Sequence, residues 1–126
     1  MYVLDFMDIG ATGEAIAAQY LKRKGYDILA ERFWTRFGEI DLVARTQDAL
    51  VFVEVKTRTG DEHGAPELAV SHEKYRRCVR ASTLYCERFP HNDLMLRLDV
   101  LAVVLDIHSR RATVRHFENI SPAFEE

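Results

Sequence analysis

The stretch GEIDLVARTQDALVFVEVKTR, residues 38–58, predicts two β-strands joined by a short polar loop. Residues 50–57 are rich in β-branched and aromatic side chains, which strands prefer. The connection over residues 45–49 is short enough for an antiparallel hairpin. Residues 38–44 follow the two-residue period of a strand. The expected apolar face of this first strand comprises Ile40, Leu42 and Ala44.

Charged side chains interrupt both strands in a pattern that indicates a metal site. Glu39 and Asp41 share one face of the first strand, and the hairpin can bring Asp41 towards the second strand. There, Glu54 and Lys56 share one face inside an otherwise apolar run. Charges in apolar surroundings are costly unless they are paired or bind a metal. Mg²⁺ typically takes one or two carboxylates together with water and phosphate oxygens. The alternative is an exposed edge strand, or a structural salt bridge between Glu54 and Lys56.

The composition is that of one globular domain. The 126 residues are 48% hydrophobic and 29% charged, which is ordinary for a domain with a core. We expect a single domain over residues 1–126, with flexible ends at residues 1–8 and 119–126. The formal net charge of −3 disfavours a protein that coats nucleic acid non-specifically. It does not exclude a nucleic-acid enzyme, because a cation bound to a carboxylate site offsets negative charge.

The sequence predicts a cytoplasmic protein with no membrane contact. No apolar run reaches the roughly 18 residues that span a bilayer. The first residues, MYVLDFMD, lack the basic start of a secretory signal. Cys78 and Cys86 fall in one expected helix, where the helical rise separates them by about 12 Å. That distance is too large for a disulfide, so we expect two free thiols.

Periodicity predicts the remaining elements. Helices are expected over residues 12–24 and 71–89, and further strands over residues 26–34, 94–106 and 112–117. The order helix, three strands, helix, two strands is satisfied compactly by one mixed sheet with helices packed on it. The buried stripe of the second helix is expected to comprise Tyr75, Cys78, Val79, Ser82, Tyr85, Cys86 and Phe89. The first strand is expected to place Ile28 and Ala30 on one face.

Glu14 extends the apolar stripe of the first expected helix by one turn, ahead of Ala17 and Leu21. This position aims a carboxylate towards the sheet. The alternative is an ordinary first-turn glutamate that the helix dipole favours.

Basic residues beside aromatic ones indicate a second kind of contact. Arg32 and Arg36 flank Phe33 and Trp34, where they could contact a nucleic-acid backbone. The first half of the second helix carries Lys74, Arg76, Arg77 and Arg80. The alternatives are aromatic residues that belong to the core and a helix face that is simply solvated.

Several motifs occur together in an order that resembles a known family. They are Gly10, Gly13 with Glu14, Gly25 with Tyr26, GEIDLVA, VFVEVKTR, Lys74, RLDV at 97–100, His116 and Asn119. Over residues 8–120 the chain resembles the YraN family of uncharacterised bacterial proteins. That family is similar to the PD-(D/E)xK restriction-endonuclease-like superfamily, and most of all to archaeal Holliday-junction resolvases. The resemblance implies an α/β fold with a central mixed five-stranded sheet flanked by helices.

The resemblance also implies roles for individual residues. Asp41 and Glu54 would ligate Mg²⁺ or Mn²⁺, helped by the backbone carbonyl of Val55. Lys56 would position or activate the attacking water, and Glu14 would complete the catalytic set from the helix. Two positions depart from the pattern of these relatives: Ile40 stands where a proline precedes the aspartate, and Glu31 stands where the family often has asparagine.

The function expected from these features is a magnesium-dependent nuclease that acts on DNA, including branched or recombination intermediates. Glu39 is a possible further metal ligand. The expected nucleic-acid contacts are Arg58, Lys74, Arg77, Lys22 and Arg36. The alternative is a nucleic-acid-binding or assembly protein that keeps the fold without catalysis. Resolvases of this type act as dimers, so a homodimer is expected by analogy.

Overall fold

A computed structural model describes residues 9–60, 70–91 and 93–120. The elements follow the predicted order, and their ends differ from the predicted ends by three residues or fewer. They are α1 (Ile9–Arg23), β1 (Asp27–Thr35), β2 (Gly38–Arg45), β3 (Ala49–Thr59), α2 (His72–Arg88), β4 (Met95–Asp106) and β5 (Arg111–Phe117). The ends predicted to be flexible are residues 1–8 and 119–126, and of these residues 1–8 and 121–126 lie outside the described residues.

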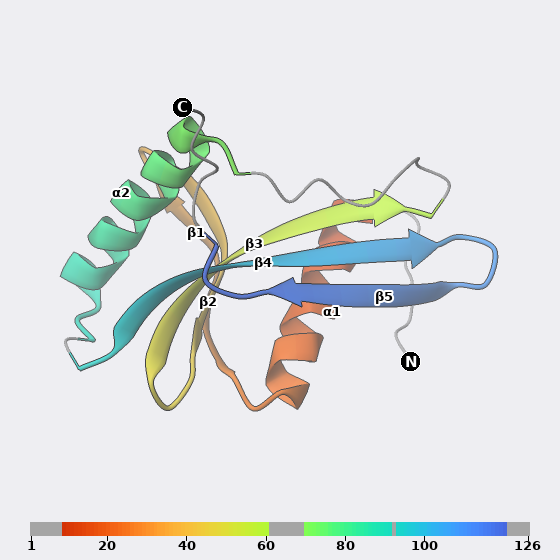
Figure 1. Ribbon diagram of the computed structural model, residues 1–126, viewed down its shortest axis with the longest axis horizontal. Coiled ribbons are helices and arrows are strands. Elements are labelled where there is room, and N and C mark those ends of the chain that lie inside the picture. Colours follow the sequence, from red (N-terminus) through yellow and green to blue (C-terminus); the bar gives the residue numbers. More distant parts are fainter. Residues whose placement is uncertain (1–8, 61–69, 92, 121–126) are drawn as a thin grey trace.

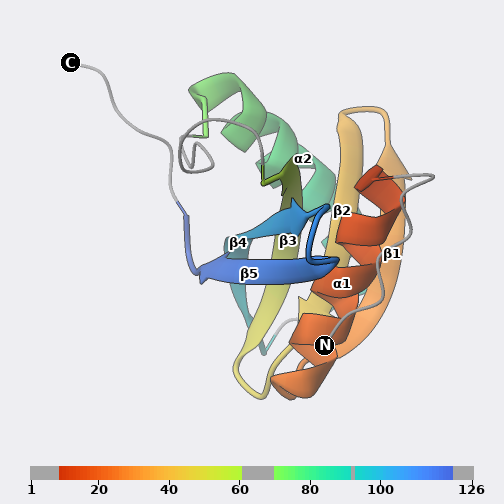
Figure 2. The same cartoon turned by 90° about the vertical axis from the view of Figure 1, so that its right-hand side faces the viewer.

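The five strands form one mixed sheet in the order β1-β2-β3-β4-β5. The first three strands are antiparallel neighbours, β3 and β4 are parallel, and β5 returns antiparallel to β4. Parallel neighbours need a crossover connection, and α2 lies in this one. The two helices cover opposite faces of the twisted sheet (Figures 1 and 2). The predicted α/β fold is confirmed, and its arrangement is consistent with that of restriction-endonuclease-like domains.

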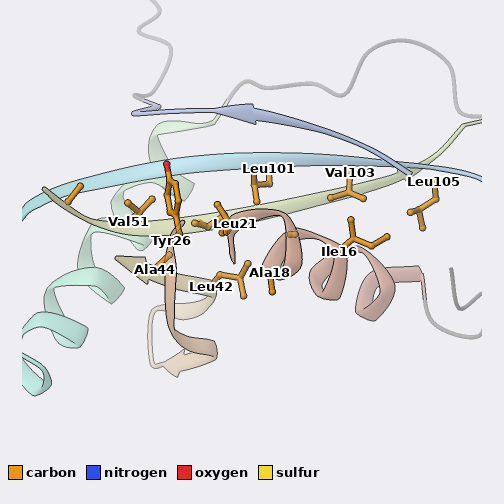
Figure 3. Close-up of a cluster of buried hydrophobic side chains, with 13 residues drawn as sticks. Ile16, Ala18, Leu21, Tyr26, Leu42, Ala44, Val51, Leu101, Val103 and Leu105 are labelled. Carbon is orange, nitrogen blue, oxygen red and sulfur yellow. The ribbon is translucent and has the colours of Figure 1, made fainter. Parts of the chain in front are cut away.

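The core on the α1 side joins the helix to the middle of the sheet. Leu21 of α1 is fully buried and belongs to one cluster with Leu42, Val53 and Leu101, which come from three successive strands (Figure 3). The apolar runs of β3 and β4 are nearly continuous because helices cover both of their faces. Among the described residues, neither helix is long and apolar enough to cross a membrane.

The core on the α2 side is smaller, and it corrects the predicted helix stripe. Ala81 and Tyr85 pack with Phe52 of β3, and Ser82 is buried beside them. Val79 is 47% exposed and Phe89 is 44% exposed, so their predicted burial is wrong. An isolated helical wheel gives the direction of an apolar stripe but not its width, and this helix contacts the sheet along a narrow line.

Strand β2 changes face at Asp41, so the predicted alternation is wrong at Ile40. Ile40 packs in the α2-side cluster, whereas Leu42 packs in the α1-side cluster. The partner strand is irregular at the same level, because Arg32, between the residues that pair with Leu42 and Ile40, has a φ of 52°. A further register shift near Leu29 puts Ile28 and Ala30 on opposite faces, contrary to the prediction.

Gly13 permits a close approach between α1 and β3. A Cβ at this position would lie 1.9 Å from Thr57 Oγ1 and 2.8 Å from Thr57 Cβ and Cγ2. Since no real contact is so short, any side chain here would push the helix away from the strand. The neighbouring Glu14 would move with it.

We therefore expect Gly13→Ala to destabilise the protein by ~1–3 kcal/mol, the usual range for overpacking. Adding Thr57→Ala should restore part of the loss, because the shortest remaining contact would be 2.8 Å. Urea denaturation measures both effects. Gly60→Ala is the matched control, since its added Cβ would meet Leu105 O at an ordinary 3.5 Å. Equal stability of Gly13→Ala and Gly60→Ala would contradict the close helix–strand contact.

Candidate metal centre

Asp41 lies where β2 separates from β3. The pairing of these strands covers only Leu42–Arg45 against Leu50–Val53. Beyond that point, the Val55 amide donates to Asp41 Oδ2 at 2.7 Å. In an extended strand the N–H and C=O of one residue point to the same side. The Val55 carbonyl, a predicted metal ligand, is therefore directed towards the side of the strand where Asp41 lies.

Four carboxylates come together around this point. Glu14 of α1, Glu39 and Asp41 each offer an oxygen, and these oxygens lie within 4.8 Å of one another. Glu54 lines the same cavity as Glu39 and Asp41. The carboxylate of Glu14 is also held by Arg32, whose Nε donates to Oε2 at 2.7 Å. This pairing was not predicted, because Arg32 reaches Glu14 only through the irregular geometry of β1.

The cavity beside the carboxylates has a volume of about 250 Å³ and opens to solvent. Its lining comprises Phe37, Gly38, Glu39, Asp41, Glu54, Lys74, Arg77, Cys78 and Ala81. Lys74 Nζ donates to Glu54 Oε1, so the lysine that contacts Glu54 comes from α2. Lys56 is half-buried in β3, two residues beyond Glu54, and is not among the described residues that line the cavity.

Burial raises the pKa of Asp41 from 3.8 to about 7. The hydrogen bond from Val55 opposes this shift, and the negative charges of Glu54, Glu14 and Glu39 add to it. The site is thus short of positive charge when all its carboxylates ionise. Oxygen ligands from several carboxylates and one backbone carbonyl suit Mg²⁺ or Mn²⁺, and such a cation would remove the repulsion.

The predicted nucleic-acid contacts lie in different places. Lys74 and Arg77 line the acidic cavity, and Arg36 lines an adjoining groove. Lys22 is exposed in the last turn of α1, and Arg58 is exposed near the end of β3, where its Nη1 donates to Thr57 O at 3.0 Å. Neither of these two is among the described residues that line the cavity or the groove.

A second buried carboxylate, Asp99, joins residues that the sequence motifs contained without a role. Arg97 donates to both of its oxygens at 2.9 Å, His116 Nε2 lies 2.7 Å from Oδ2, and the Asn119 amide donates to Oδ1 at 2.9 Å. Burial raises the pKa of Asp99, but the hydrogen bonds from His116, Arg97 and Asn119 outweigh burial and lower it. Both oxygens are used, so this cluster is structural.

This network includes the first residues of the end that was predicted to be flexible. Asn119 and the next residue are held, because Asn119 bonds to Asp99 and the Ile120 amide donates to Leu98 O at 2.7 Å. Lys24 belongs to the same network, with its Nζ 3.1 Å from His116 Nδ1. A lysine ammonium can only donate, so Nδ1 accepts and Nε2 carries the proton that bonds to Asp99.

The fold and the carboxylate cavity define an α/β domain with a restriction-endonuclease-like arrangement and a candidate cation site at the open end of its central hairpin. Residues 13–103 match the family described as uncharacterised protein family UPF0102, and the chain belongs to that family. This match confirms the resemblance to an uncharacterised bacterial family.

Relatives of the chain carry the same family name. A UPF0102 protein of Syntrophomonas wolfei is 39% identical over 112 residues, which cover 89% of this chain and 96% of the relative. One of Syntrophus aciditrophicus is 42% identical over 116 residues, 92% of this chain and 87% of the relative. One of Alkaliphilus oremlandii is 43% identical over 113 residues, 88% of this chain and 95% of the relative. These names state membership and no activity.

We expect Asp99→Asn to destabilise the protein by roughly 3–5 kcal/mol, because it leaves the Arg97 guanidinium without its buried counter-charge. Chemical denaturation measures the loss. Asp106→Asn is a matched control, since Asp106 is also on β4 but is exposed. A loss no larger than that of the control would contradict the structural role of the network.

Asp41→Asn should have the opposite effect on the metal-free protein. The folded pKa of about 7 exceeds the ordinary 3.8. Stability from the protonated carboxyl is therefore full below pH 3.8 and is lost as the pH rises through about 7. At about pH 8 the variant should be more stable by ~1–2 kcal/mol, after discounting for solvent screening of a half-buried group.

Denaturation of the metal-free protein at several pH values between about 5 and 8 measures this difference. The asparagine Oδ1 can still accept from Val55, so the variant should fold normally. Asp48→Asn, at an exposed position in the turn between β2 and β3, is the control and should keep the original pH dependence. An Asp41→Asn variant with that same pH dependence would show that Asp41 is not the titrating group.

Proposed function

We propose that the protein is a metal-dependent nuclease that hydrolyses DNA phosphodiester bonds with Mg²⁺ or Mn²⁺. The observation that carries the proposal is the convergence of Glu14, Glu39 and Asp41 within 4.8 Å, beside a cavity that Glu54 also lines. A protein without a cation at this point would have little physical reason to gather so many carboxylates. Branched DNA and recombination intermediates are the substrates that the resemblance to Holliday-junction resolvases implies.

The metal would be held by Asp41 and Glu54, with Glu39 and the Val55 carbonyl as further ligands. Bound there, Mg²⁺ or Mn²⁺ supplies Lewis acidity and a water of lowered pKa for hydrolysis. Glu14 completes the set, and Arg32 fixes its carboxylate through the 2.7 Å bond. The amide of Val55 fixes Asp41 in the same way, so two of the acidic groups are oriented before any ligand arrives.

Cations from two elements serve the substrate. By strand alternation Lys56 stands on the face of β3 that carries Glu54, where its ammonium would orient the attacking water and balance charge on the phosphate. Lys74 and Arg77 of α2 line the cavity and would contact the flanking phosphates. Cytoplasmic location and a homodimer are part of this proposal.

A second candidate is a nucleic-acid-binding or assembly protein that keeps the fold without catalysis. The ion pair between Lys74 and Glu54 favours it, because this contact already satisfies Glu54 without a metal. In addition, the lysine that contacts Glu54 is Lys74 of α2, and not Lys56 of the strand motif. The two candidates differ in turnover, so cleavage assays separate them.

The test is a panel of labelled linear, nicked, flapped and four-way DNA substrates, incubated with Mg²⁺, Mn²⁺ or EDTA. We expect metal-dependent cleavage of at least one substrate by the unmodified protein. Metal should also raise the melting temperature, because it binds only the folded arrangement. At ~100 times the dissociation constant the stabilisation is about 2.7 kcal/mol, a shift of several degrees for a domain of this size.

Variants separate the roles of the residues. Asp41→Asn should lose both the metal-dependent shift and cleavage. Lys56→Ala should keep the shift and lose cleavage, because its ammonium serves water and phosphate. The exposed Asp48→Asn variant should keep both. A metal-dependent shift without cleavage of any substrate in the panel would favour the non-catalytic candidate, and the absence of both would exclude the metal site.

A further inference from the structure

A groove of about 600 Å³ adjoins the acidic cavity at the turn between β1 and β2. It lies between this turn and the first half of α2. Its lining comprises Trp34, Thr35, Arg36, Phe37, Gly38, Glu73, Arg76, Arg77 and Arg80. Phe37, Gly38 and Arg77 line the cavity as well. The groove and the cavity therefore share part of their walls, so an extended ligand in one would lie next to the other.

The groove has the charge opposite to that of the cavity. Four arginines line it, and all four are exposed, against one carboxylate of the lining, that of Glu73. Among the described residues, no ion pair joins any of these arginines to a carboxylate. The arginines are Arg36, Arg76, Arg77 and Arg80. Such a set of guanidinium groups matches a row of phosphates.

Aromatic rings lie among these cations. Trp34 is 73% exposed, although a tryptophan normally buries most of its surface. The ring of Phe37 lies 5.0 Å from the Arg36 guanidinium carbon and 5.5 Å from that of Arg80. Aromatic rings and guanidinium groups are both planar, and both stack on nucleobases.

The turn after Trp34, which carries Phe37, is fixed by its own hydrogen bonds. Thr35 Oγ1 donates to Gly38 O at 2.7 Å and accepts from the Phe37 amide at 3.1 Å. Gly38 has a φ of 130°, which favours glycine. Trp34 lies on β1 next to this turn and pairs with Glu39 of β2, so little ordering of its backbone is needed when a ligand binds.

We propose that this groove binds an unpaired segment of DNA, with bases stacked on Trp34 and Phe37 and phosphates on the arginines. Stacking requires exposed base faces, which a single strand offers and an intact duplex hides. The proposal rests on the proposed function, since it specifies the substrate: DNA with a single-stranded stretch beside the phosphodiester that enters the acidic cavity.

Trp34 is the only tryptophan in the chain, so its fluorescence reports directly on stacking. The protein is titrated in EDTA with a twelve-nucleotide oligo-dT, a blunt duplex of the same length and a polyglutamate peptide. We expect saturable quenching by oligo-dT at concentrations well below those needed for the duplex, and none by polyglutamate. EDTA prevents cleavage, so this readout is independent of the nuclease activity.

Variants are compared by the fluorescence anisotropy of labelled oligo-dT. Trp34→Ala should weaken binding on the order of tenfold, whereas Trp34→Phe should keep most of the affinity. Arg80→Ala should weaken binding and reduce the slope of log affinity against log salt by about 0.7, the value for one lost phosphate contact on a single strand. Arg45→Ala, at an exposed arginine outside the groove lining, is the matched control and should bind normally.

The proposal is overturned if oligo-dT does not quench Trp34, if the duplex or polyglutamate binds equally well, or if Trp34→Ala binds oligo-dT like the unmodified protein. Folding does not confuse these outcomes, because Trp34 is largely exposed. Quenching without cleavage of any substrate in the DNA panel would contradict the proposed nuclease activity and support binding in the groove. Cleavage without quenching would contradict binding in the groove and support the proposed nuclease activity.

Discussion

The candidate site depends on one hydrogen bond, from the Val55 amide to Asp41 Oδ2. A strand amide in a sheet must have an acceptor, and a neighbouring carbonyl normally supplies it. Here the Asp41 carboxylate is the acceptor. The pairing of β2 with β3 can therefore end at Leu42 without leaving the Val55 amide unbonded. The opened sheet gives the cavity its room. The same bond fixes Asp41 at the edge of the cavity, so one contact both shapes the site and orients its central carboxylate.

The separation of charge around this opening would allow a chain of net charge −3 to bind the polyanion that we propose as its substrate. Carboxylates gather at the point where β2 separates from β3, and α1 contributes Glu14 there. Arginines gather in the adjoining groove, on the first half of α2 and the β1–β2 turn. Under the proposed function, a cation in the first region and phosphates in the second would complement each other, because the backbone of one nucleic acid would contact both. The net charge does not reveal this arrangement, because the negative charges of one region and the positive charges of the other offset each other in the sum.

The sequence predicts the order of elements, because long periodic segments and the hairpin loop are local signals. It also predicts that the short hairpin brings Asp41 towards the face of Glu54, and both residues line the same cavity. The face of Ile40 was predicted wrongly, because the change of face depends on paired irregularities in two strands. The contact of Arg32 with Glu14 depends on the same irregularity. Lys74 reaches Glu54 across 20 residues of sequence, and no spacing rule foresees such a contact.

Among the described residues, two clusters could be taken for metal sites, and the hydrogen-bond partners of Asp99 and Asp41 distinguish them. Asp99 is fully buried, and its four hydrogen bonds, two of them from Arg97, lower its pKa. A metal there would have to displace an arginine that already supplies the counter-charge. Asp41 accepts one amide hydrogen bond and faces three other carboxylates, and burial with their charge raises its pKa to about 7. A carboxylate whose charge is balanced within the protein stabilises the fold, whereas one that is surrounded by other negative charges favours either a proton or a bound cation. The proposed metal is therefore assigned to the point where β2 separates from β3, and the Asp99 network joins β4, β5 and the residues around the end of α1.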